Sequence, residues 1–281
     1  MVFKLLNVLG LSRHLNFSFF KKINGRKFTF PYIYKTGQGH LYETEPWMSE
    51  LFKLLNAQKG VNIFYDFGAN TGQTLLKYLS VFGNSGNYFG FEPNPYCVSY
   101  LNTLIVKNNI KNASIIPVAV SNFNGTVELQ LYSDDPSDSS ASIVREFRNG
   151  VMRRLHVAAM RLKDCCSDMP GPDLIKVDVE GGELLILEEL QEGFLANRPI
   201  ILLEILPVYN KENLTRLAHA KNILSWGKKN NYKLFQIVKY KNKLKEIVLQ
   251  TEVRIHSDLS LCDYIFVPQE KSSSFSGLVQ Q

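Results

Sequence analysis

Asp66 and Glu92 are well placed to bind a ligand, because each ends or follows an apolar run and precedes a sharp turn. The run 61–65 predicts a buried strand, and the run 87–91 predicts a second one. In open α/β sheets, an acidic residue at a strand end followed by a glycine turn and a helix is typical of a site for a nucleotide-like ligand. A carboxylate at the tip of the second strand can accept hydrogen bonds from both hydroxyls of a ribose. The two residues therefore indicate a nucleoside-containing cofactor.

The turn after Asp66 indicates which cofactor fits. Gly68 and Gly72 are four positions apart with Asn70 between them, so the G-x-G-x-x-G spacing that surrounds a pyrophosphate is missing. The chain also contains no G-x-x-x-x-G-K-[ST] motif for a nucleoside triphosphate. S-adenosylmethionine has no phosphate, and Asp66 with the turn amides can hold its amino-acid end. The alternative is an ordinary tight turn, with Glu92 as a charge beside the next helix. The cofactor-binding residues predicted here are Asp66, Gly68, Ala69, Asn70, Thr71, Gly72, Thr74, Glu92, Pro93 and Asn94.

A second acidic cluster lies in the stretch 173–183. Strand alternation places Lys176, Asp178 and Glu180 on one side of a predicted strand and apolar residues on the other. Charges inside an apolar strand are costly unless they are paired or lie at its exposed end. Two glycines follow Glu180, so both carboxylates are expected at the carboxyl end of the strand, beside the cofactor crevice. The alternative is that Asp178 or Glu180 caps the next helix, 183–190.

Four sequence blocks resemble the FkbM family of S-adenosylmethionine-dependent methyltransferases. They are D-F-G-A-N-T-G at 66–72, F-E-P-N-P at 91–95, V-A-V-S-N at 118–122 and I-K-V-D-V-E-G-G-E at 175–183. Each block is loose by itself, but together they are specific, and the resemblance extends over residues 40–205. It implies a methyltransferase-type Rossmann fold, S-adenosyl-L-methionine as cofactor, and O-methylation, often of sugars in glycans or natural products. The last two blocks add Ala119, Val120 and Ser121, near the expected adenine end, and Asp178 to the predicted cofactor residues.

Methyl transfer to a hydroxyl requires aligned reactants and is assisted by a base that accepts the hydroxyl proton. The predicted catalytic residues are Asp178 as first candidate, Glu204 at the end of the fifth strand as second, and Glu180, which could serve either purpose. His156 is a further candidate base, although a lone histidine is more often structural. Two carboxylates at neighbouring strand ends could also hold Mg²⁺, which prefers oxygen ligands. Because no third oxygen ligand is closely spaced with them, no metal-binding residue is predicted.

These residues require a sheet to position them. The expected fold class is α/β, a Rossmann-like methyltransferase fold with a seven-stranded, mostly parallel sheet, helices on both faces, and an N-terminal hairpin and helix. Asn24-Gly25 between alternating residues predicts the hairpin, and segments 232–237 and 262–267 are expected to complete the sheet. Residues 126–131 predict an inserted strand, followed by a Ser-rich loop, 133–142, that is expected near the acceptor. The predicted domains are a basic N-terminal extension at 1–45, a methyltransferase domain at 46–268 and a flexible tail at 269–281.

Charge is unevenly distributed along the 281 residues. The net charge is +6, yet residues 1–40 and 213–245 contain none of the 26 acidic side chains. These basic segments indicate attraction to an anionic partner, either a membrane surface or a phosphate-bearing substrate. The alternative is a solvated surface, particularly for the spread-out lysines of 228–245. The oligomeric state is not predicted.

Cysteine usage and hydropathy indicate the compartment. The four cysteines show no C-x-x-C pairing, which argues against a zinc site and favours a reduced, cytoplasmic protein. Peripheral contact with a membrane is compatible with the basic segments. No apolar run is long enough to predict a transmembrane helix, and residues 1–15 lack a signal-peptide cleavage pattern.

The function expected from these observations is O-methylation of a small-molecule or glycan acceptor. The basic segments leave RNA or DNA methylation as an alternative. Base-modifying enzymes of that class carry an N/D-P-P-Y/F tetrad, where this chain has Asp178-Val179-Glu180-Gly181. A cofactor-binding scaffold without catalysis is a third interpretation, disfavoured by the presence of Asp66, Glu92 and Asp178 together.

Overall fold

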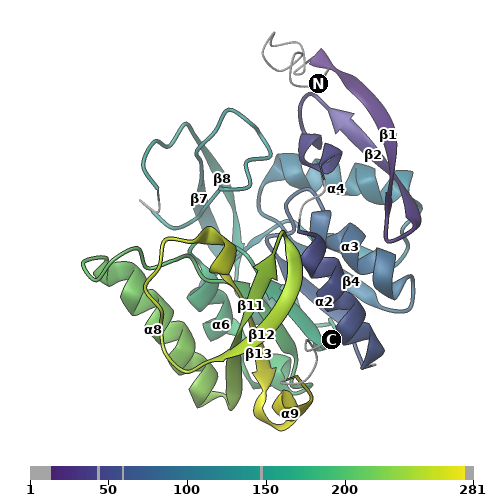
Figure 1. Ribbon diagram of the computed structural model, residues 1–281. Coiled ribbons are helices and arrows are strands. Elements are labelled where there is room, and N and C mark those ends of the chain that lie inside the picture. Colours follow the sequence, from purple (N-terminus) through teal and green to yellow (C-terminus); the bar gives the residue numbers. More distant parts are fainter. Residues whose placement is uncertain (1–13, 43–44, 59, 146–147, 276–281) are drawn as a thin grey trace.

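An eight-stranded mixed sheet organises the part of the chain that the computed structural model describes, residues 14–42, 45–58, 60–145 and 148–275 (Figure 1). The strand order is β12-β11-β13-β10-β9-β3-β4-β5. Five strands are parallel: β5 (Ala113–Ile116), β4 (Asn87–Phe91), β3 (Ile63–Phe67), β9 (Leu174–Val177) and β10 (Ile200–Glu204). Three antiparallel strands extend the sheet beyond β10: β13 (Asp263–Pro268), β11 (Tyr232–Tyr240) and β12 (Lys243–Gln250). The Rossmann-like α/β fold class is confirmed.

Strand β12 is a correction to the expected seven-stranded sheet. Its lysines and glutamate obscure the apolar pattern, and a register shift that leaves Lys245 unpaired is what places both Leu244 and Ile247 against the same core. It pairs with β11 across a two-residue turn, Lys241-Asn242, in which φ is 49° and 62°. Two left-handed residues in a row match the twist of a hairpin, although neither residue is glycine. The turn was therefore invisible to a search for glycine-containing hairpin loops.

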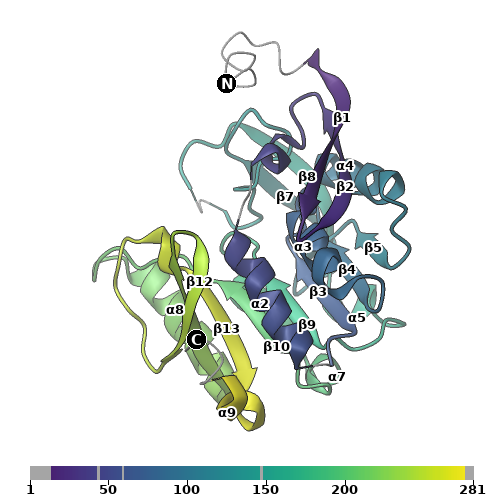
Figure 2. The same ribbon diagram turned by 45° about the vertical axis from the view of Figure 1, so that its right-hand side comes forward.

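Helices cover both faces of the sheet, because alternate residues of each strand point to opposite faces. On one face, α2 (Pro46–Ala57), α3 (Gln73–Phe82) and α4 (Pro95–Lys107) share a core with Phe64 of β3. Tyr65, the next residue, belongs to the core on the other face. That core includes side chains from α5 (Leu162–Cys165), α6 (Glu183–Glu189), α7 (Glu192–Leu195) and α8 (Leu214–Lys229). Figure 2 shows α2 and α8 separated by the sheet.

The N-terminal hairpin is confirmed. Strands β1 (Asn16–Ile23) and β2 (Arg26–Ile33) pair across Asn24-Gly25, both of which have positive φ. Phe28 and Phe30 of β2 are buried in the same core as α4, so the hairpin is packed onto the domain. The short helix η2 (Gln38–Leu41) then leads toward α2. Residues 1–13 and 43–44 of the predicted extension lie outside the described residues.

An insertion between β5 and α5 forms a separate three-stranded sheet. Its strands are β6 (Ala119–Val120), β8 (Arg153–Met160) and β7 (Gly125–Leu131), in that spatial order. The inserted strand predicted at 126–131 corresponds to β7. Figure 1 shows β7 and β8 projecting beyond the carboxyl end of the parallel strands. The insertion thus extends from the edge where ligands bind in this class of fold.

The C-terminal segment forms short helices as far as it is described. After η3 (Leu259–Leu261) and β13 come η4 (Gln269–Lys271) and α9 (Ser272–Phe275). The side chain of Phe275 is buried, with its ring 6.5 Å from that of Phe235. Residues 269–275 of the predicted flexible tail therefore pack on the domain, because a large apolar side chain is removed from water. Residues 276–281 lie outside the described part. No helix in the described ranges is both long and apolar enough to cross a membrane.

Candidate functional site

Two cavities meet at the carboxyl ends of the parallel strands. The larger cavity has a volume of about 370 Å³ and is lined by the turns after β3 and β4 and by the insertion. The smaller one, about 180 Å³, is lined by β10, β11, β13 and the start of α2. Glu45, Lys176 and Asp178 line both. These three residues therefore form the boundary between the cavities.

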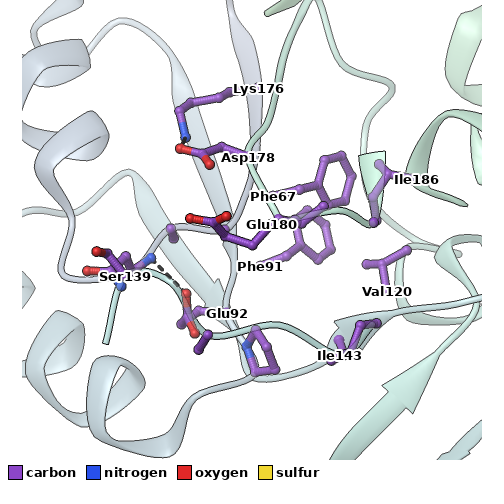
Figure 3. A pocket seen from close by; sticks show the side chains of 18 of the residues that line it. Phe67, Phe91, Glu92, Val120, Ser139, Ile143, Lys176, Asp178, Glu180 and Ile186 are labelled. Atoms are coloured by element: carbon purple, nitrogen blue, oxygen red, sulfur yellow. Dashed lines mark hydrogen bonds and ion pairs between the residues drawn. The ribbon is translucent and has the colours of Figure 1, made fainter. Parts of the chain in front are cut away.

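The larger cavity has an apolar end and an acidic end (Figure 3). The rings of Phe67 and Phe91 stack with their centroids 4.5 Å apart. Val120, Ile143 and Ile186 complete this apolar end in the close-up view. The acidic end is formed by the carboxylates Glu92, Asp178 and Glu180. The cavity thus combines a surface for a flat, apolar ring with an excess of negative charge.

The turn after β3 packs directly against the end of β9. Gly68 has φ of 86°, and a Cβ atom added there would lie 1.9 Å from the backbone oxygen of Asp178. The Asp178 backbone N–H also donates to the Phe67 carbonyl at 3.1 Å. Any side chain at position 68 would push the two segments apart. Glycine is therefore required here both by conformation and by space.

Glu92 is anchored by backbone amides. Its Oε2 accepts a hydrogen bond from the Asn70 N–H at 2.7 Å, and its Oε1 accepts one from the Asn94 N–H at 2.8 Å. Burial raises the pKa of this carboxyl to about 7, although the two amides act to lower it. Glu92 thus connects the two turns that follow β3 and β4. Each carboxylate oxygen has a second lone pair for a ligand hydroxyl.

Lys176 lies between two carboxylates. It is in register with Asp66 on the neighbouring strand, so both side chains point to the same face of the sheet. Its Nζ is 2.8 Å from Oδ2 of Asp178 and 3.7 Å from Oδ1 of Asp66. Burial acts to lower the pKa of Lys176, but the two carboxylates hold it above its ordinary value. Asp66 is fully buried and also accepts a hydrogen bond from Tyr88 Oη at 2.5 Å; burial raises its pKa to about 6.

Asp178 and Glu204 titrate as a pair. Burial acts to raise the pKa of Asp178, but the charge of Lys176 and its hydrogen bond lower that pKa below the ordinary value. Burial, and then the negative charge of Asp178, raise the pKa of Glu204 to about 9. At neutral pH, Asp178 is therefore an ionised carboxylate and Glu204 a neutral acid that can donate a hydrogen bond.

Glu180 is held in a strained conformation at the cavity wall. Its φ is 52°, in the left-handed region that non-glycine residues rarely adopt. Its carbonyl accepts from Ser142 Oγ at 2.7 Å, and its carboxylate pairs with Arg148 at 2.8 Å. Burial raises its pKa to about 7, despite the Arg148 charge. The Ser-rich loop thus holds the backbone of Glu180 in place through Ser142.

The same loop covers the cofactor turn. The Asn70 side-chain amide donates to the Ser137 carbonyl at 3.3 Å, and that of Asn94 donates to the Pro136 carbonyl at 2.7 Å. Asp138 and Ser139 line the larger cavity. The loop was expected near the acceptor, but among the described residues it lines the larger cavity and not the smaller one.

Most of the predicted site residues converge on this region. Those that line the larger cavity are Gly68, Ala69, Asn70, Thr74, Glu92, Pro93, Ala119, Val120, Asp178 and Glu180. Glu204 lines the smaller cavity together with Asp178. The residues that line neither cavity are Asp66, Thr71, Gly72, Asn94 and Ser121.

The residues that line neither cavity are involved in the structure around the larger cavity. The side chain of Asp66 points toward Lys176, because the two residues are in register on neighbouring strands and so face the same side of the sheet. Gly72 begins α3, and the Asn94 side chain caps α4 by accepting from the Tyr96 N–H. The Thr71 carbonyl accepts from His40, and the Ser121 N–H donates to the Met160 carbonyl. These five residues thus support the residues that line the cavity, and their direct contact with the cofactor stays a prediction.

His156 is not part of the site. It is exposed on β8, opposite Glu128, and lines neither cavity. Alternation along the inserted hairpin directs its side chain to solvent.

Three residues of the site were not assigned by sequence reasoning. Lys176 was recognised only as a charge on the polar side of its strand, although a lysine within an apolar strand signals a buried partner.

His40 is buried, and its Nε2 lies 2.9 Å from the Thr71 carbonyl. Burial lowers the pKa of His40 to about 4, so the neutral ring donates this bond from Nε2–H. Glu45 reaches the cavity boundary from the residue before α2 and pairs with Lys77 at 3.0 Å. No local motif marks the last two.

The larger cavity fits S-adenosylmethionine in its chemistry. Its volume falls in the range of about 300–1,000 Å³ that is usual for small-molecule sites. The apolar end suits an adenine ring, Glu92 suits ribose hydroxyls, and the carboxylates suit a ligand with a positively charged sulfur. The same excess of negative charge disfavours a pyrophosphate. Among the described residues, no group of three or more His, Cys, Asp or Glu side chains is arranged to hold a metal ion.

Comparison with known proteins gives a family match. Residues 66–234, more than half of the chain, match the model of the methyltransferase FkbM domain. None of the curated proteins matches the sequence. A solved FkbM methyltransferase from Methylobacillus flagellatus is 15% identical with a TM-score of 0.46, covering 74% of this chain and 43% of that one. The chain thus spans less than half the length of that protein.

Two further solved structures are similar. An SAH-bound methyltransferase from Podospora anserina is 10% identical with a TM-score of 0.46, covering 80% of this chain and 76% of that one. Fibrillarin from Aeropyrum pernix, in complex with S-adenosyl-L-methionine, is 13% identical with a TM-score of 0.43, covering 89% and 81%.

Proposed function

This chain belongs to the FkbM methyltransferase family and uses S-adenosyl-L-methionine, and from that premise we propose that it is an O-methyltransferase acting on a sugar hydroxyl of a glycan or glycoconjugate. The observation that carries the proposal is the position of Asp178 at the boundary of the two cavities. The larger cavity suits the methyl donor. An acceptor in the smaller cavity then meets the donor beside an ionised carboxylate.

The lining of the smaller cavity supports a polyhydroxylated acceptor. Glu204, Asp263 and Asn242 supply hydrogen-bonding groups, and Lys239 forms an ion pair with Asp263. Alternating donors and acceptors of this kind can bind several hydroxyls of one sugar ring. Met48 and Leu259 supply apolar surface for the carbon skeleton.

The roles of the protein residues follow from their protonation states. When bound, S-adenosylmethionine supplies a methyl group on a positively charged sulfur. Asp178 accepts the proton of the acceptor hydroxyl as its oxygen takes up the methyl group, and the bound donor would be left as a neutral thioether. Glu204, protonated at neutral pH, orients the acceptor oxygen or Asp178 by donating a hydrogen bond. Lys176 holds Asp178 in its ionised form.

The test compares Asp178→Asn with Glu204→Gln, using labelled S-adenosylmethionine and a panel of sugars, sugar phosphates and sugar nucleotides as acceptors. Asn removes the base, so turnover should fall by about 10²–10⁴-fold while cofactor affinity is kept. Gln mimics a neutral carboxyl, so Glu204→Gln should stay within a fewfold of wild type at pH 7. Loss of activity in Glu204→Gln alone would assign the base to Glu204. Methylation of RNA or DNA oligonucleotides instead of sugars would overturn the proposed acceptor.

A further inference from the structure

A third cavity, of about 280 Å³, lies between the N-terminal hairpin, α2, α3 and the start of β12. We call it the lysine groove, because Lys21, Lys22, Lys53, Lys77 and Lys243 line it. Figure 2 shows α2 between β12 and α3, which form two of its walls. The cavity-lining lysines come from four separate elements.

The groove unites the two basic segments of the sequence. Lys21 and Lys22 belong to the segment 1–40, and Lys243 belongs to the segment 213–245. Helix α2 brings them together by packing against both α3 and β12. Glu50 of α2 fixes this contact by accepting a hydrogen bond from the Leu244 N–H at 2.7 Å. Charges that are more than 200 positions apart in sequence thus line one cavity.

The balance of charge in the groove is positive. Lys22, Lys53 and Lys243 are exposed and make no ion pair with any residue that the structure describes. Lys21 donates to two backbone carbonyls, those of His40 and Tyr42, at 3.4 and 2.9 Å.

Two carboxylates oppose these lysines. Glu45 forms an ion pair with Lys77 but does not itself line the groove. Glu50 is the carboxylate among the described residues that line the groove. An anion with several oxygens would therefore complete the groove, and lysine ammonium groups are common ligands of phosphate.

The groove adjoins the methyl-transfer site. Gln73 lines both the groove and the larger cavity. The partner of Lys77, Glu45, lines the boundary between the larger and smaller cavities. One molecule can therefore place an anionic group in the groove and reach toward Asp178 with its other end.

We propose that the lysine groove binds the phosphate or diphosphate group of the acceptor, which makes the substrate a phosphorylated or nucleotide-linked sugar. This proposal rests on the proposed sugar O-methylation. Anionic lipid headgroups offer the same phosphate chemistry. The concave shape of the groove favours a phosphate group that enters it over the surface of a bilayer.

The experiment measures binding of inorganic pyrophosphate by isothermal titration in phosphate-free buffer, without any methyl acceptor. The double variant Lys53→Ala/Lys243→Ala should bind pyrophosphate about tenfold more weakly or worse, since two charges near the anion are removed. Its affinity for S-adenosylmethionine should not change. Lys221→Ala/Lys228→Ala is the matched control: it removes two exposed lysines of the same basic segment, but from α8 on the opposite face of the sheet.

The outcomes separate this proposal from the proposed function. Equal weakening in both double variants, or no weakening in Lys53→Ala/Lys243→Ala, would overturn the groove as the phosphate site, even if sugars are methylated. Specific pyrophosphate binding without methylation of any phosphorylated sugar would leave the groove as an anion site and refute its role in binding the acceptor. A last arm uses vesicles of phosphatidylglycerol and of phosphatidylcholine. Groove-dependent binding to the anionic vesicles, without binding of pyrophosphate, would assign the groove to a lipid headgroup and overturn the proposal.

Discussion

The ammonium nitrogen of Lys176 lies 2.8 Å from Oδ2 of Asp178, at the boundary of the two cavities. The same ammonium is 3.7 Å from the fully buried carboxylate of Asp66. A cation shared in this way keeps Asp178 ionised and compensates a charge that would otherwise be costly to bury. The protonation of the candidate base therefore depends on a residue of the sheet interior.

Removing Lys176 should destabilise the protein strongly. Lys176→Met leaves Asp66 without its cation, and breaking a buried pair typically costs about 3–5 kcal/mol. The free energy of unfolding, measured by urea denaturation, should fall by that amount. The double variant Lys176→Met/Asp66→Asn, which removes both charges, should recover a substantial part of it. A neutral effect of Lys176→Met alone would show that Asp66 is protonated without Lys176.

Gly68→Ala should be more damaging than a change at another left-handed glycine. Gly25 of the hairpin turn has φ of 82° and open space where a Cβ would lie, so Gly25→Ala reports only the conformational cost, about 1–2 kcal/mol. Gly68→Ala adds the overlap with the Asp178 carbonyl. We expect a larger loss of stability in urea denaturation, together with weaker binding of S-adenosylmethionine. Equal effects of the two substitutions would mean that the turn can move away from β9 at little cost.

The pH dependence of turnover should reveal Glu204. Its pKa is raised to about 9, so the carboxyl is neutral below that pH and ionises above it. Ionisation places a second negative charge beside Asp178 and removes a hydrogen-bond donor, so turnover should decline as the pH rises through about 9. Glu204→Gln cannot ionise, and its pH–rate profile should lack this alkaline decline. If the variant retains the decline, the titrating group is another residue.

His40→Phe should loosen the cofactor turn. The change removes the hydrogen bond to the buried Thr71 carbonyl, which should lower the free energy of unfolding by about 1–3 kcal/mol and weaken cofactor binding. The pKa of His40 is 6.5 in the unfolded reference and about 4 in the fold, so the unfolded state binds more protons between these values. The stability from His40 is therefore present above pH 6.5 and lost as the pH falls toward 4.

The pH series for His40→Phe has a matched control in the exposed histidine of β8. The difference in unfolding free energy between wild type and His40→Phe should shrink as the pH falls from 6.5 toward about 4. His156→Phe should show no such trend. A constant difference at all pH values would indicate that His40 contributes only by packing.

Much of the fold was predictable because its signals are local. The glycine turn after Asp66, the helix start at Pro95 and the hairpin at Asn24-Gly25 each depend on a few adjacent residues. Strand β12 was missed because its turn, Lys241-Asn242, achieves two left-handed residues without glycine. Its charged residues also resembled a solvated surface.

The candidate site residues that lie at strand ends were predictable from the sequence. Glu92, Asp178 and Glu204 lie at such ends, and all three line one of the cavities. Their protonation states were not predictable, because the pKa of Glu204 depends on burial and on Asp178 of the neighbouring strand. The partner of His40 is 31 positions away in sequence, so no spacing rule connects them. The contact of Asp66 with Lys176 was not predictable either, because it depends on the register between β3 and β9, which the sequence does not state.

The two cavities are lined by largely different residues, and this affects how the specificity for the acceptor can change. Segments 67–93 and 118–143 contribute much of the wall of the larger cavity, whereas Met48, Asn242 and Leu259 line the smaller cavity alone. Under the proposed function, replacement of those three side chains should alter which molecule is methylated without disturbing the groups that hold the methyl donor. The close contact of Gly68 with Asp178, in contrast, fixes the distance between donor turn and base. Under the proposed function, the acceptor can therefore be changed by substitutions in the smaller cavity, while the contact between Gly68 and Asp178 keeps the transfer geometry fixed.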